Sequence, residues 1–348
     1  MVSLKDVAAL SGVSPATVSR AINNPGMVDP ETRKTIQAAM KKLNYRPNLV
    51  ASGLRTRNSR QIALIVPDAI HHTSATMIQH TSRLLQEKGY TLILGNHHNR
   101  YETEKELLNT YFSRNIDGII LYLIYDETRA VQSLLEQEER RVPVVIVGRR
   151  INVDSFSNVA TDNYLAGVMA GEYLGSIGHK RVATVTGPRI TQWARDRLDG
   201  FRDGLAKYQA QLEWQYSQTD LPDFETGLAA CDALMADYAG RALPTAIWAQ
   251  NDIIAAAVLK SLTNQGYRVP EDFSLCGFDN VTSSGYQRIQ LTSVENYTFN
   301  HGKSAFNLLL ERIEGGLNNR EDQPINRVEY RSRLIVRGST GKPRSTGL

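Results

Sequence analysis

The sequence predicts a small all-α head followed by a two-lobed α/β body whose lobes are built on parallel, doubly wound sheets. Three observations support this fold class. The first 60 residues contain short helical segments that carry their own start signals. After residue 60, short β-branched runs alternate with longer segments of helical periodicity, and this scheme occurs twice. The length of 348 residues fits two or three domains, and 41% hydrophobic residues are enough for a sizeable core.

Residues 4–23, LKDVAALSGVSPATVSRAIN, predict two helices separated by a tight turn at residues 11–13. Ser14 can cap the second helix, and Pro15 fits its first position, where a missing N–H costs nothing. We expect a shared apolar contact from Val7, Ala8, Leu10, Val13, Val18, Ala21 and Ile22. This contact leaves five residues of the second helix on or near its outward side: Pro15, Ala16, Thr17, Ser19 and Arg20. This pattern is typical of a helix-turn-helix, although alone it fits an αα-hairpin of no special use equally well.

A third helix and the local charge favour the DNA-binding interpretation. The third helix begins at Asp29-Pro30, again a cap followed by proline, and its apolar residues close a three-helix core. Residues 1–60 hold ten Lys or Arg against three Asp or Glu, a net charge of +7. The whole chain carries +4, so residues 61–348 sum to −3. Positive charge is concentrated where the motif lies, as DNA binding requires.

The body is predicted from strand and helix alternation. The first group has strands near 62–66, 91–95, 117–121 and 142–147, with helices near 75–88, 102–114 and 127–138. The second group has strands near 181–186, 212–216, 246–248 and 273–276, with helices near 164–177, 194–208, 224–238 and 252–265. A strand near 291–294, a helix near 300–315 and two terminal strands follow. This pattern predicts parallel sheets with a ligand cleft outside the carboxyl ends of their strands.

Several classes of function are disfavoured. No run of eighteen apolar residues or charged-then-apolar leader is present, so we expect a soluble cytoplasmic protein. Cys231 and Cys276 match no CxxC spacing and are expected to be reduced and buried. There is no GxSxG, HExxH or strand-following GxGxxG, and GSTGK at 338–342 is too short for a phosphate loop, so we expect no enzyme and no cofactor.

The segments LKDVAALSGVSPATVSRAINNPGMVDPETR and LNYRPNLVASGLRT, with the body up to about residue 340, resemble the LacI-type family of bacterial transcription regulators. The resemblance implies a helix-turn-helix domain at 1–47, a hinge at 48–60, a periplasmic-binding-protein-like body at 61–340 and a tail at 341–348. It also implies discontinuous lobes, one of about 61–159 and 290–320 and the other of about 160–289 and 321–340. The pattern alone fits two tandem lobes equally well. A sugar-binding transport component shares such a body, but it would need an export signal and would lack the basic head.

The resemblance assigns DNA-binding roles by position. Arg20 is expected to contact guanine, and Pro15 and Ala16 to read shape and a thymine methyl. Phosphate contacts and register are expected from Lys5, Ser14, Thr17, Asn23 and Tyr45, with Ser19 on the same face. In the hinge, the resemblance implies a short helix that forms only on specific DNA and contains Asn48, Ala51 and Leu54. Leu54 would wedge into the minor groove, and Gly53 would weaken the free helix.

Effector-binding residues are expected just after the strands of both lobes. In the first lobe they are Asp68, Thr73, Ser74 and Arg149. In the second they are Trp193, Arg195, Arg197, Phe224, Asn251 and Asp279. Family motifs match at Arg197, Asn251 and Asp279, whereas we expect Asp162 and Asp252 to cap helices.

The first-lobe loop departs from the family pattern. Where members often read PDISNPFF, this chain has PDAIHHTS, so Thr73 and Ser74 replace two aromatics. This favours a sugar or sugar derivative over a nucleoside. Two histidine pairs, at residues 71–72 and 97–98, raise the question of a metal site. Adjacent histidines point apart, however, and no further ligand recurs at a suitable spacing. We therefore expect these histidines to be polar lining of the cleft and expect no metal. His301 is expected to be structural.

The resemblance also implies partners. Family members are symmetric homodimers, so the expected DNA partner is a double-stranded, pseudo-palindromic operator. The tail has no leucine heptad, so we expect a dimer and not a tetramer. Both induction and co-repression occur in the family. We expect induction by a catabolic sugar. We expect no membrane association.

Overall fold

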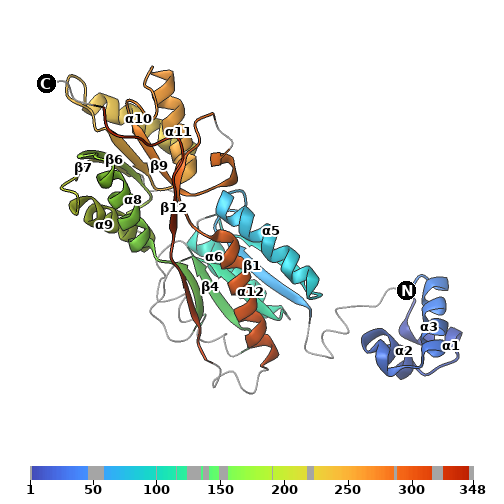
Figure 1. Cartoon of the computed structure of the whole chain (residues 1–348). Coiled ribbons are helices and arrows are strands. Elements are labelled where there is room, and N and C mark those ends of the chain that lie inside the picture. The colour runs from blue at the N-terminus through green and yellow to red at the C-terminus, as the bar shows by residue number, and fades with distance from the viewer. Residues whose placement is uncertain are drawn as a thin grey trace. The chain divides into compact units, whose positions relative to one another are not determined.

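The computed structural model describes residues 2–45, 59–98, 100–114, 116–123, 135, 141–148, 156–189, 191–217, 223–285, 288–315 and 324–344. The chain divides into two compact units, Met1–Arg60 and Gln61–Leu348 (Figure 1). The predicted hinge helix and nearly all of the predicted helix at 127–138 lie outside the described residues. Within the described ranges, no helix has both the length and the apolar character needed to cross a membrane.

The described residues of the head form three helices and one short 3-10 turn. They are α1 Leu4–Ser11, α2 Pro15–Asn23, η1 Pro25–Met27 and α3 Pro30–Lys42. Gly12 ends α1 with φ +72°, a left-handed conformation that suits glycine, and so allows the tight turn into α2. Ser14 accepts from the backbone N–H of Thr17, and Asp29 accepts from those of Glu31 and Thr32. Both predicted caps are therefore present.

The core of the head contains most of the predicted apolar residues. Val7, Val18 and Ile36 are almost fully buried where the three helices meet. Leu10 was placed in this contact incorrectly, because it is 43% exposed. The buried stripe of α1 passes through Leu4, Val7 and Ala8, at positions i, i+3 and i+4, and Leu10 falls beside that stripe.

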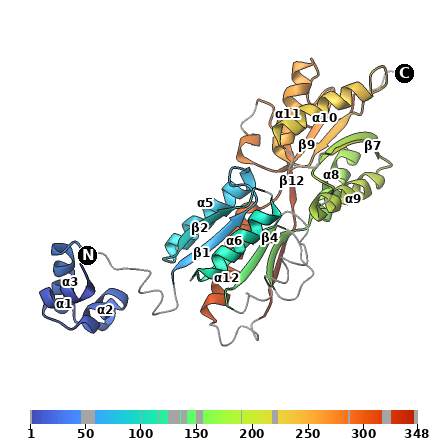
Figure 2. The same cartoon turned by 180° about the vertical axis from the view of Figure 1, so that it is seen from behind.

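The first lobe of the body is a three-layer α/β/α structure. Its six-stranded parallel sheet has the order β11-β5-β4-β3-β1-β2. The strands are β1 Gln61–Val66, β2 Thr91–Asn96, β3 Gly118–Tyr122, β4 Val144–Gly148, β5 Ser157–Thr161 and β11 Arg327–Tyr330. Helix α6 (Tyr101–Ser113) packs on one face through residues such as Leu108. Helices α5 (His72–Glu87) and α12 (Thr298–Glu314) lie side by side on the other face (Figures 1 and 2).

The second lobe repeats this architecture. Its sheet has the order β12-β10-β9-β8-β6-β7 and is parallel except for β12, which runs antiparallel to β10. The strands are β6 Arg181–Thr186, β7 Gln211–Ser217, β8 Ala246–Ala249, β9 Ser274–Asp279, β10 Thr292–Glu295 and β12 Arg333–Ile335. Helices α8 (Asn163–Ser176) and α9 (Gln192–Ala206) cover one face. Helices α10 (Phe224–Asp237) and α11 (Asp252–Asn264) cover the other.

The chain passes between the lobes three times, and the expected lobe boundaries are wrong at two of these passages. Strand β10 was placed in the first lobe, but it pairs with β9 of the second. Strand β11 was placed in the second lobe, but it pairs with β5 of the first. Strand β5 itself was not predicted, because its sequence SNVAT mixes polar and apolar residues although all five are buried. Asn158 is accommodated there by donating to the carbonyl of Ile146 at 3.1 Å.

Helices α8 and α9 meet through glycines. Gly167 and Gly171 of α8 face the backbone of α9, and Gly200 and Gly204 of α9 face the backbone of α8. A Cβ atom at any of the four would lie closer than 3.0 Å to backbone atoms of the facing helix. The two helices can approach this closely only because these four positions carry no side chain. This contact fixes α9 against the start of α8, next to the ends of the strands.

Candidate functional site

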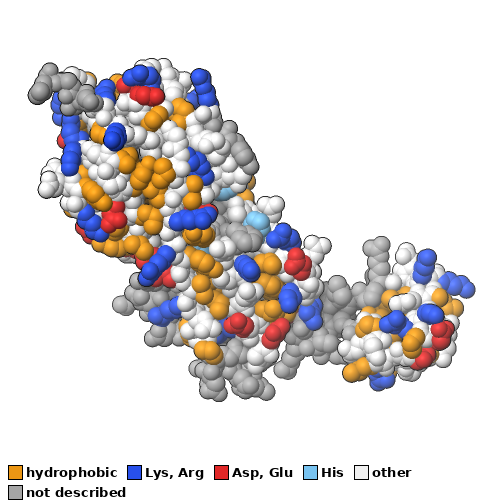
Figure 3. All heavy atoms as spheres, viewed as in Figure 1, with side chains coloured by type: hydrophobic (Ala, Val, Ile, Leu, Met, Phe, Trp, Pro, Cys, Tyr) orange, Lys and Arg blue, Asp and Glu red, His pale blue; other side chains and the backbone are white. Residues whose placement is uncertain are grey.

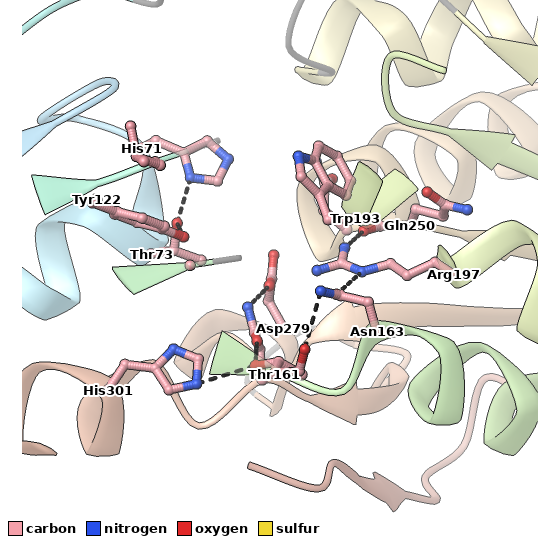
Figure 4. A pocket seen from close by; sticks show the side chains of 14 residues that line it. His71, Thr73, Tyr122, Thr161, Asn163, Trp193, Arg197, Gln250, Asp279 and His301 are labelled. Carbon is pink, nitrogen blue, oxygen red and sulfur yellow. Dashed lines mark hydrogen bonds between the residues drawn. The ribbon is translucent and has the colours of Figure 1, made fainter. Parts of the chain in front are cut away.

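A pocket of the body lies between the carboxyl ends of the strands of both lobes (Figure 4). It encloses about 640 Å³ of space free of atoms, including the part open to solvent. The lining from the first lobe and from α12 consists of His71, Thr73, Tyr122, Leu123, Gly148, Thr161 and His301. The lining from the second lobe and the adjoining crossover consists of Asn163, Trp193, Arg197, Gln250, Asn251, Asp279 and Asn296. This is the position that parallel doubly wound lobes provide for a ligand.

Arg197 is a buried cation held rigidly at the pocket wall. Its Nε donates to Asn163 at 2.8 Å, and its Nη1 donates to the carbonyl of Gln250 at 3.0 Å. The guanidinium lies 3.5 Å from the ring centroid of Phe278 and 4.8 Å from that of Trp193. Burial lowers its pKa to about 10, so it remains charged at neutral pH. Nη2 has no hydrogen-bond partner within the described ranges and is available to a ligand acceptor.

Asp279 supplies the opposite charge. It ends β9 with φ +103°, and its Oδ1 accepts from the amide nitrogen of Asn296 at 2.9 Å. Burial raises its pKa to about 6, although Arg197 and the Asn296 hydrogen bond act in the opposite direction. The carboxylate therefore remains an acceptor for ligand hydroxyl groups at neutral pH.

Aromatic and hydroxyl side chains complete the walls. Trp193 packs directly over Gly187, where a Cβ atom would collide with the indole ring. On the first-lobe side, Thr73 lies 2.9 Å from His71 Nδ1 and 3.5 Å from the Tyr122 hydroxyl. Burial raises the pKa of Tyr122 and lowers that of His71, so both stay neutral near pH 7. The pocket thus combines one fixed cation, one carboxylate, neutral donors and acceptors, and an aromatic face. A polyhydroxylated ring can pair with all of these groups.

The structure brings five predicted effector residues together at the pocket. They are Thr73, Trp193, Arg197, Asn251 and Asp279. Arg149 lies outside the described residues.

Four other candidates lie elsewhere. Asp68 accepts from the backbone of Ile70 in a turn, and Ser74 is buried on α5 outside the pocket lining. Arg195 donates to the carbonyl of Arg189 and to Gln192, because it lies two positions from Arg197 on α9 and so points to a different side. Phe224 packs near Lys260 at the start of α10.

Of the two aspartates predicted to cap helices near the pocket, one does so and the other does not. Asp162 caps α8, as expected, by accepting from the backbone of Leu165. Asp252 was expected to cap α11, but Asn251 does so by accepting from Ile254 at 2.7 Å. The Asp252 carboxylate instead accepts from the backbone N–H of Val281 and from two serine hydroxyls.

Several lining residues were not predicted from the sequence. Gln250 and Asn296 directly follow strands β8 and β10, and Thr161 ends β5. The strand-end rule would have found Gln250 and Asn296, and it would have found Thr161 had β5 been recognised. Asn163 and His301 lie in helices α8 and α12. No sequence signal distinguished Asn163, and His301 was expected to be structural, but it lines the pocket.

The paired histidines do not form a common cluster. His71 contacts Thr73, whereas His72 lies 3.4 Å from Thr76. His97 is buried with Nε2 3.8 Å from Glu104, and His98 is exposed. No group of three His, Cys, Asp or Glu side chains in the described parts of the chain could hold a metal ion.

Four of the predicted DNA-binding residues of the head are exposed on α1 and α2. Lys5, Pro15, Ala16 and Arg20 are exposed, as expected for a DNA-contacting face. Figure 3 shows Lys and Arg side chains spread over the visible face of this unit. The other predicted DNA-binding residues either contact other residues of the head, are half-buried, or have side chains outside the described part of the structure.

Ser14 and Thr17 engage each other, with 2.8 Å between their hydroxyl oxygens. Ser19 and Tyr45 are half-buried, and Tyr45 packs against the head core. Asn23 ends α2, but its side chain is not among those described. Asn48, Ala51 and Leu54 also lie outside the described residues.

A helix-turn-helix unit and a two-lobed body with a pocket between its lobes define the class of ligand-responsive DNA-binding regulators. Residues 3–48 match the family described as "Bacterial regulatory proteins, lacI family". Residues 172–340 match the "Periplasmic binding protein-like domain".

Similar proteins cover nearly the whole chain. The "HTH-type transcriptional repressor PurR" of Escherichia coli O139:H28 (strain E24377A / ETEC) is 32% identical over 342 residues, which cover 97% of each protein. The solved "transcriptional regulator CelR-cellobiose complex" is 28% identical, with a TM-score of 0.70 and coverage of 97% of this chain and 100% of that one. The solved "lac repressor dimer bound to operator and the anti-inducer ONPF" is 24% identical, with a TM-score of 0.86 and coverage of 98% and 99%.

The chain therefore belongs to the lacI family of bacterial regulatory proteins. It is a DNA-binding transcriptional regulator with an effector-binding domain. The predicted resemblance and the predicted fold class are both confirmed.

Proposed function

We propose that this protein is a transcriptional repressor whose affinity for operator DNA is controlled by a sugar or sugar derivative bound between the two lobes. The observation that carries the proposal is that Arg197 and Asp279 line one polar pocket together with Trp193. A sugar ring offers hydroxyl groups that both donate and accept, and an apolar face that can stack on an indole. Repression agrees with the PurR relative, which is a transcriptional repressor.

The first-lobe wall favours a sugar over a flat base. Thr73 stands where the family pattern often has the first of two consecutive aromatics, and it contacts the His71 imidazole and the Tyr122 hydroxyl. A flat ring would leave several of these polar groups without partners, which is costly in a buried site. CelR, at 28% identity, is named in complex with the sugar cellobiose, which agrees with the same class of ligand.

A ligand screen tests the effector class. Full-length protein would be melted with D-glucose, D-galactose, D-ribose, cellobiose, sugar acids and nucleosides, because a ligand of the folded state raises the melting temperature. We expect stabilisation by at least one sugar or sugar acid and none by nucleosides. Stabilisation by nucleosides alone would reject the sugar assignment.

The proposed DNA partner is a double-stranded pseudo-palindrome contacted by a homodimer, with two α2 helices in successive major grooves. The hinge residues Asn48, Ala51 and Leu54 would contact the centre of the site. We propose induction as the sign of control, so that the sugar binds the DNA-free state more tightly than the DNA-bound state. Titration of the bound sugar into a protein–operator complex should release the DNA. Tighter DNA binding in that titration would establish co-repression instead.

We further infer that the protein works in the cytoplasm and is a regulator, not an enzyme. Both inferences rest on its bacterial family and on relatives named as transcriptional regulators.

Arg20→Ala is expected to remove operator preference. Arg20 is exposed on α2, and a bidentate contact to guanine contributes about 1–3 kcal/mol of discrimination, or about 5- to 150-fold per half-site. Weak, salt-sensitive binding to any duplex should persist. Gel-shift titrations with operator and scrambled duplexes measure the ratio of the affinities for the two DNAs. Lys5→Ala is the control, because loss of a phosphate contact should weaken both duplexes equally. Unchanged operator preference in Arg20→Ala would contradict the assignment.

Sugar affinity is expected to fall as the pH drops below about 6. The folded pKa of Asp279 is about 6, so about one molecule in eleven retains the carboxylate at pH 5, and the association constant should fall about tenfold relative to pH 7.5. Arg197 stays charged throughout this range, and burial keeps His301 neutral with a pKa of about 4. Calorimetry at the two pH values measures the change. In Asp279→Asn, residual affinity should be independent of pH, and equal pH dependence in both proteins would exclude Asp279 as the titrating group.

A further inference from the structure

A chain of hydrogen bonds runs from the second lobe to the first along the floor of the pocket (Figure 4). Asn296 donates from Nδ2 to Asp279 at 2.9 Å, and its Oδ1 accepts from the Thr161 hydroxyl at 2.8 Å. Thr161 Oγ1 lies 3.1 Å from Nε2 of His301 on α12. The four residues come from β9, the β10–α12 crossover, β5 and α12, so the chain joins both lobes and two of the three crossovers.

In this chain of hydrogen bonds, the donor and the acceptor of each bond can be assigned. A carboxylate can only accept, so the amide of Asn296 must turn its NH₂ group toward Asp279 and its oxygen toward Thr161. The Thr161 hydroxyl has one proton, and that proton is used in donating to Asn296. Thr161 must therefore accept from His301, which requires the proton of His301 to be on Nε2.

This proton position leaves Nδ1 of His301 as an acceptor. His301 is only 4% exposed, it lines the pocket, and Nδ1 has no hydrogen-bond partner among the residues the structure describes. Figure 4 shows that the second ring nitrogen faces the space below Thr73 and Tyr122. Because burial lowers the pKa of His301 to about 4, the ring is neutral and the lone pair on Nδ1 stays available. Nδ1 is thus an acceptor open to the pocket, and a ligand that supplies a donor there can form a hydrogen bond with it.

We infer that His301 is a specificity-determining residue of the pocket, which accepts a hydrogen bond through Nδ1 from a hydroxyl or N–H group of the effector. The inference rests on the proposed function and narrows it. The ligand group at His301 must donate, whereas the group that meets Nη2 of Arg197 must accept. A sugar hydroxyl satisfies the first condition, but an ether or keto oxygen does not.

The tautomer can be tested without any ligand. Nitrogen-15 NMR of full-length protein labelled only at histidine, with His301→Phe used for assignment, distinguishes a protonated from an unprotonated Nδ1. We expect His301 to be the Nε2–H tautomer from pH 6.5 to 8. A protonated Nδ1 in that range overturns the inference, whether or not a sugar has been found.

The ligand contact is tested with D-glucose, D-galactose, D-ribose and cellobiose and their monofluorinated analogues. Fluorine cannot donate, so for a sugar that binds the wild type, one fluorinated position should lose about tenfold or more in affinity. In His301→Phe the parent sugar should lose a similar factor, and that same fluorine substitution should cause no further loss. His72→Phe, at a half-buried histidine outside the pocket lining, should behave as wild type.

The outcomes separate the inference from the proposed function. If a sugar binds wild type and His301→Phe equally well, or if every fluorine penalty persists in His301→Phe, His301 does not contact the ligand. If none of the four sugars binds wild type, the sugar assignment loses its support, and the tautomer measurement alone decides whether His301 presents an acceptor. Operator binding by His301→Phe verifies that the variant is folded.

Discussion

Asp279→Ala is expected to abolish the response to the effector while leaving operator binding intact. The substitution removes the pocket's carboxylate acceptor and releases Asn296, which the carboxylate orients. A hydrogen bond to a charged group contributes about 1.5–3 kcal/mol, and a sugar can form two with one carboxylate, so affinity should fall about 100-fold or more. Arg197→Ala should have a comparable effect, because it removes the only buried guanidinium that lines the pocket in the described residues.

The pKa of Asp279 indicates that this loss will not come from unfolding. Its folded pKa of about 6 lies above the usual value of 3.8, so the folded state binds the proton more tightly than the unfolded state. The stability contributed by this group is present below pH 3.8 and is lost as the pH rises toward 6. At neutral pH the carboxylate therefore lowers the free energy of unfolding. A group kept at such a cost beside a pocket is more typical of binding than of structure.

Calorimetry with the sugar identified by the screen measures this effect, and gel shifts with operator verify DNA binding. Asp199→Ala is the matched control, because Asp199 lies on α9 with its side chain 64% exposed. It should bind the sugar with wild-type affinity. If Asp279→Ala and Arg197→Ala both still release operator in response to the sugar at wild-type concentrations, the effector does not occupy this pocket.

The head could be predicted almost completely from its sequence because its signals are local. Ser14 and Asp29 cap the helices that follow them, and each lies immediately before a proline. The misplacement of Leu10 came from treating every apolar residue of α1 as core. Helical geometry provides a single stripe for the contact, and a small head leaves some apolar side chains exposed.

The pocket was predictable only where it depends on strand ends recognised from sequence. Arg197, Asn251 and Asp279 follow well-patterned strands or family motifs, and the structure places all three at the pocket. Thr161 ends β5 at a crossover between the lobes, whose position depends on which distant strand pairs with which. Such pairing leaves no local signal, and β5 gave none because hydrogen bonds accommodate its buried polar residues. His301 resembles a core position of α12, and only the tertiary structure reveals the pocket beside it.

Gly200→Leu is expected to destabilise the body more than any single change in the pocket. A side chain at Gly200 would collide with the carbonyl oxygen of Tyr164 on α8, which is backbone and cannot move as a flexible side chain can. The helices would have to separate, and their contact is continued by Gly167, Gly171 and Gly204. Overpacking of this kind costs about 3 kcal/mol or more, enough to lower the melting temperature by about 6–12 °C.

The same substitution should damage the pocket in molecules that remain folded. Arg197 lies less than one turn before Gly200 on α9, and its hydrogen bond to Asn163 spans the interface between α9 and α8. Separation of the helices would break that bond and shift the guanidinium. Asp199→Leu is the matched control, since it adds the same side chain to the exposed face of the same helix. Thermal and urea unfolding should show a large loss only for Gly200→Leu. Equal stability of the two variants would mean that α8 and α9 tolerate a side chain between them, and that the glycine contact does not fix the position of Arg197.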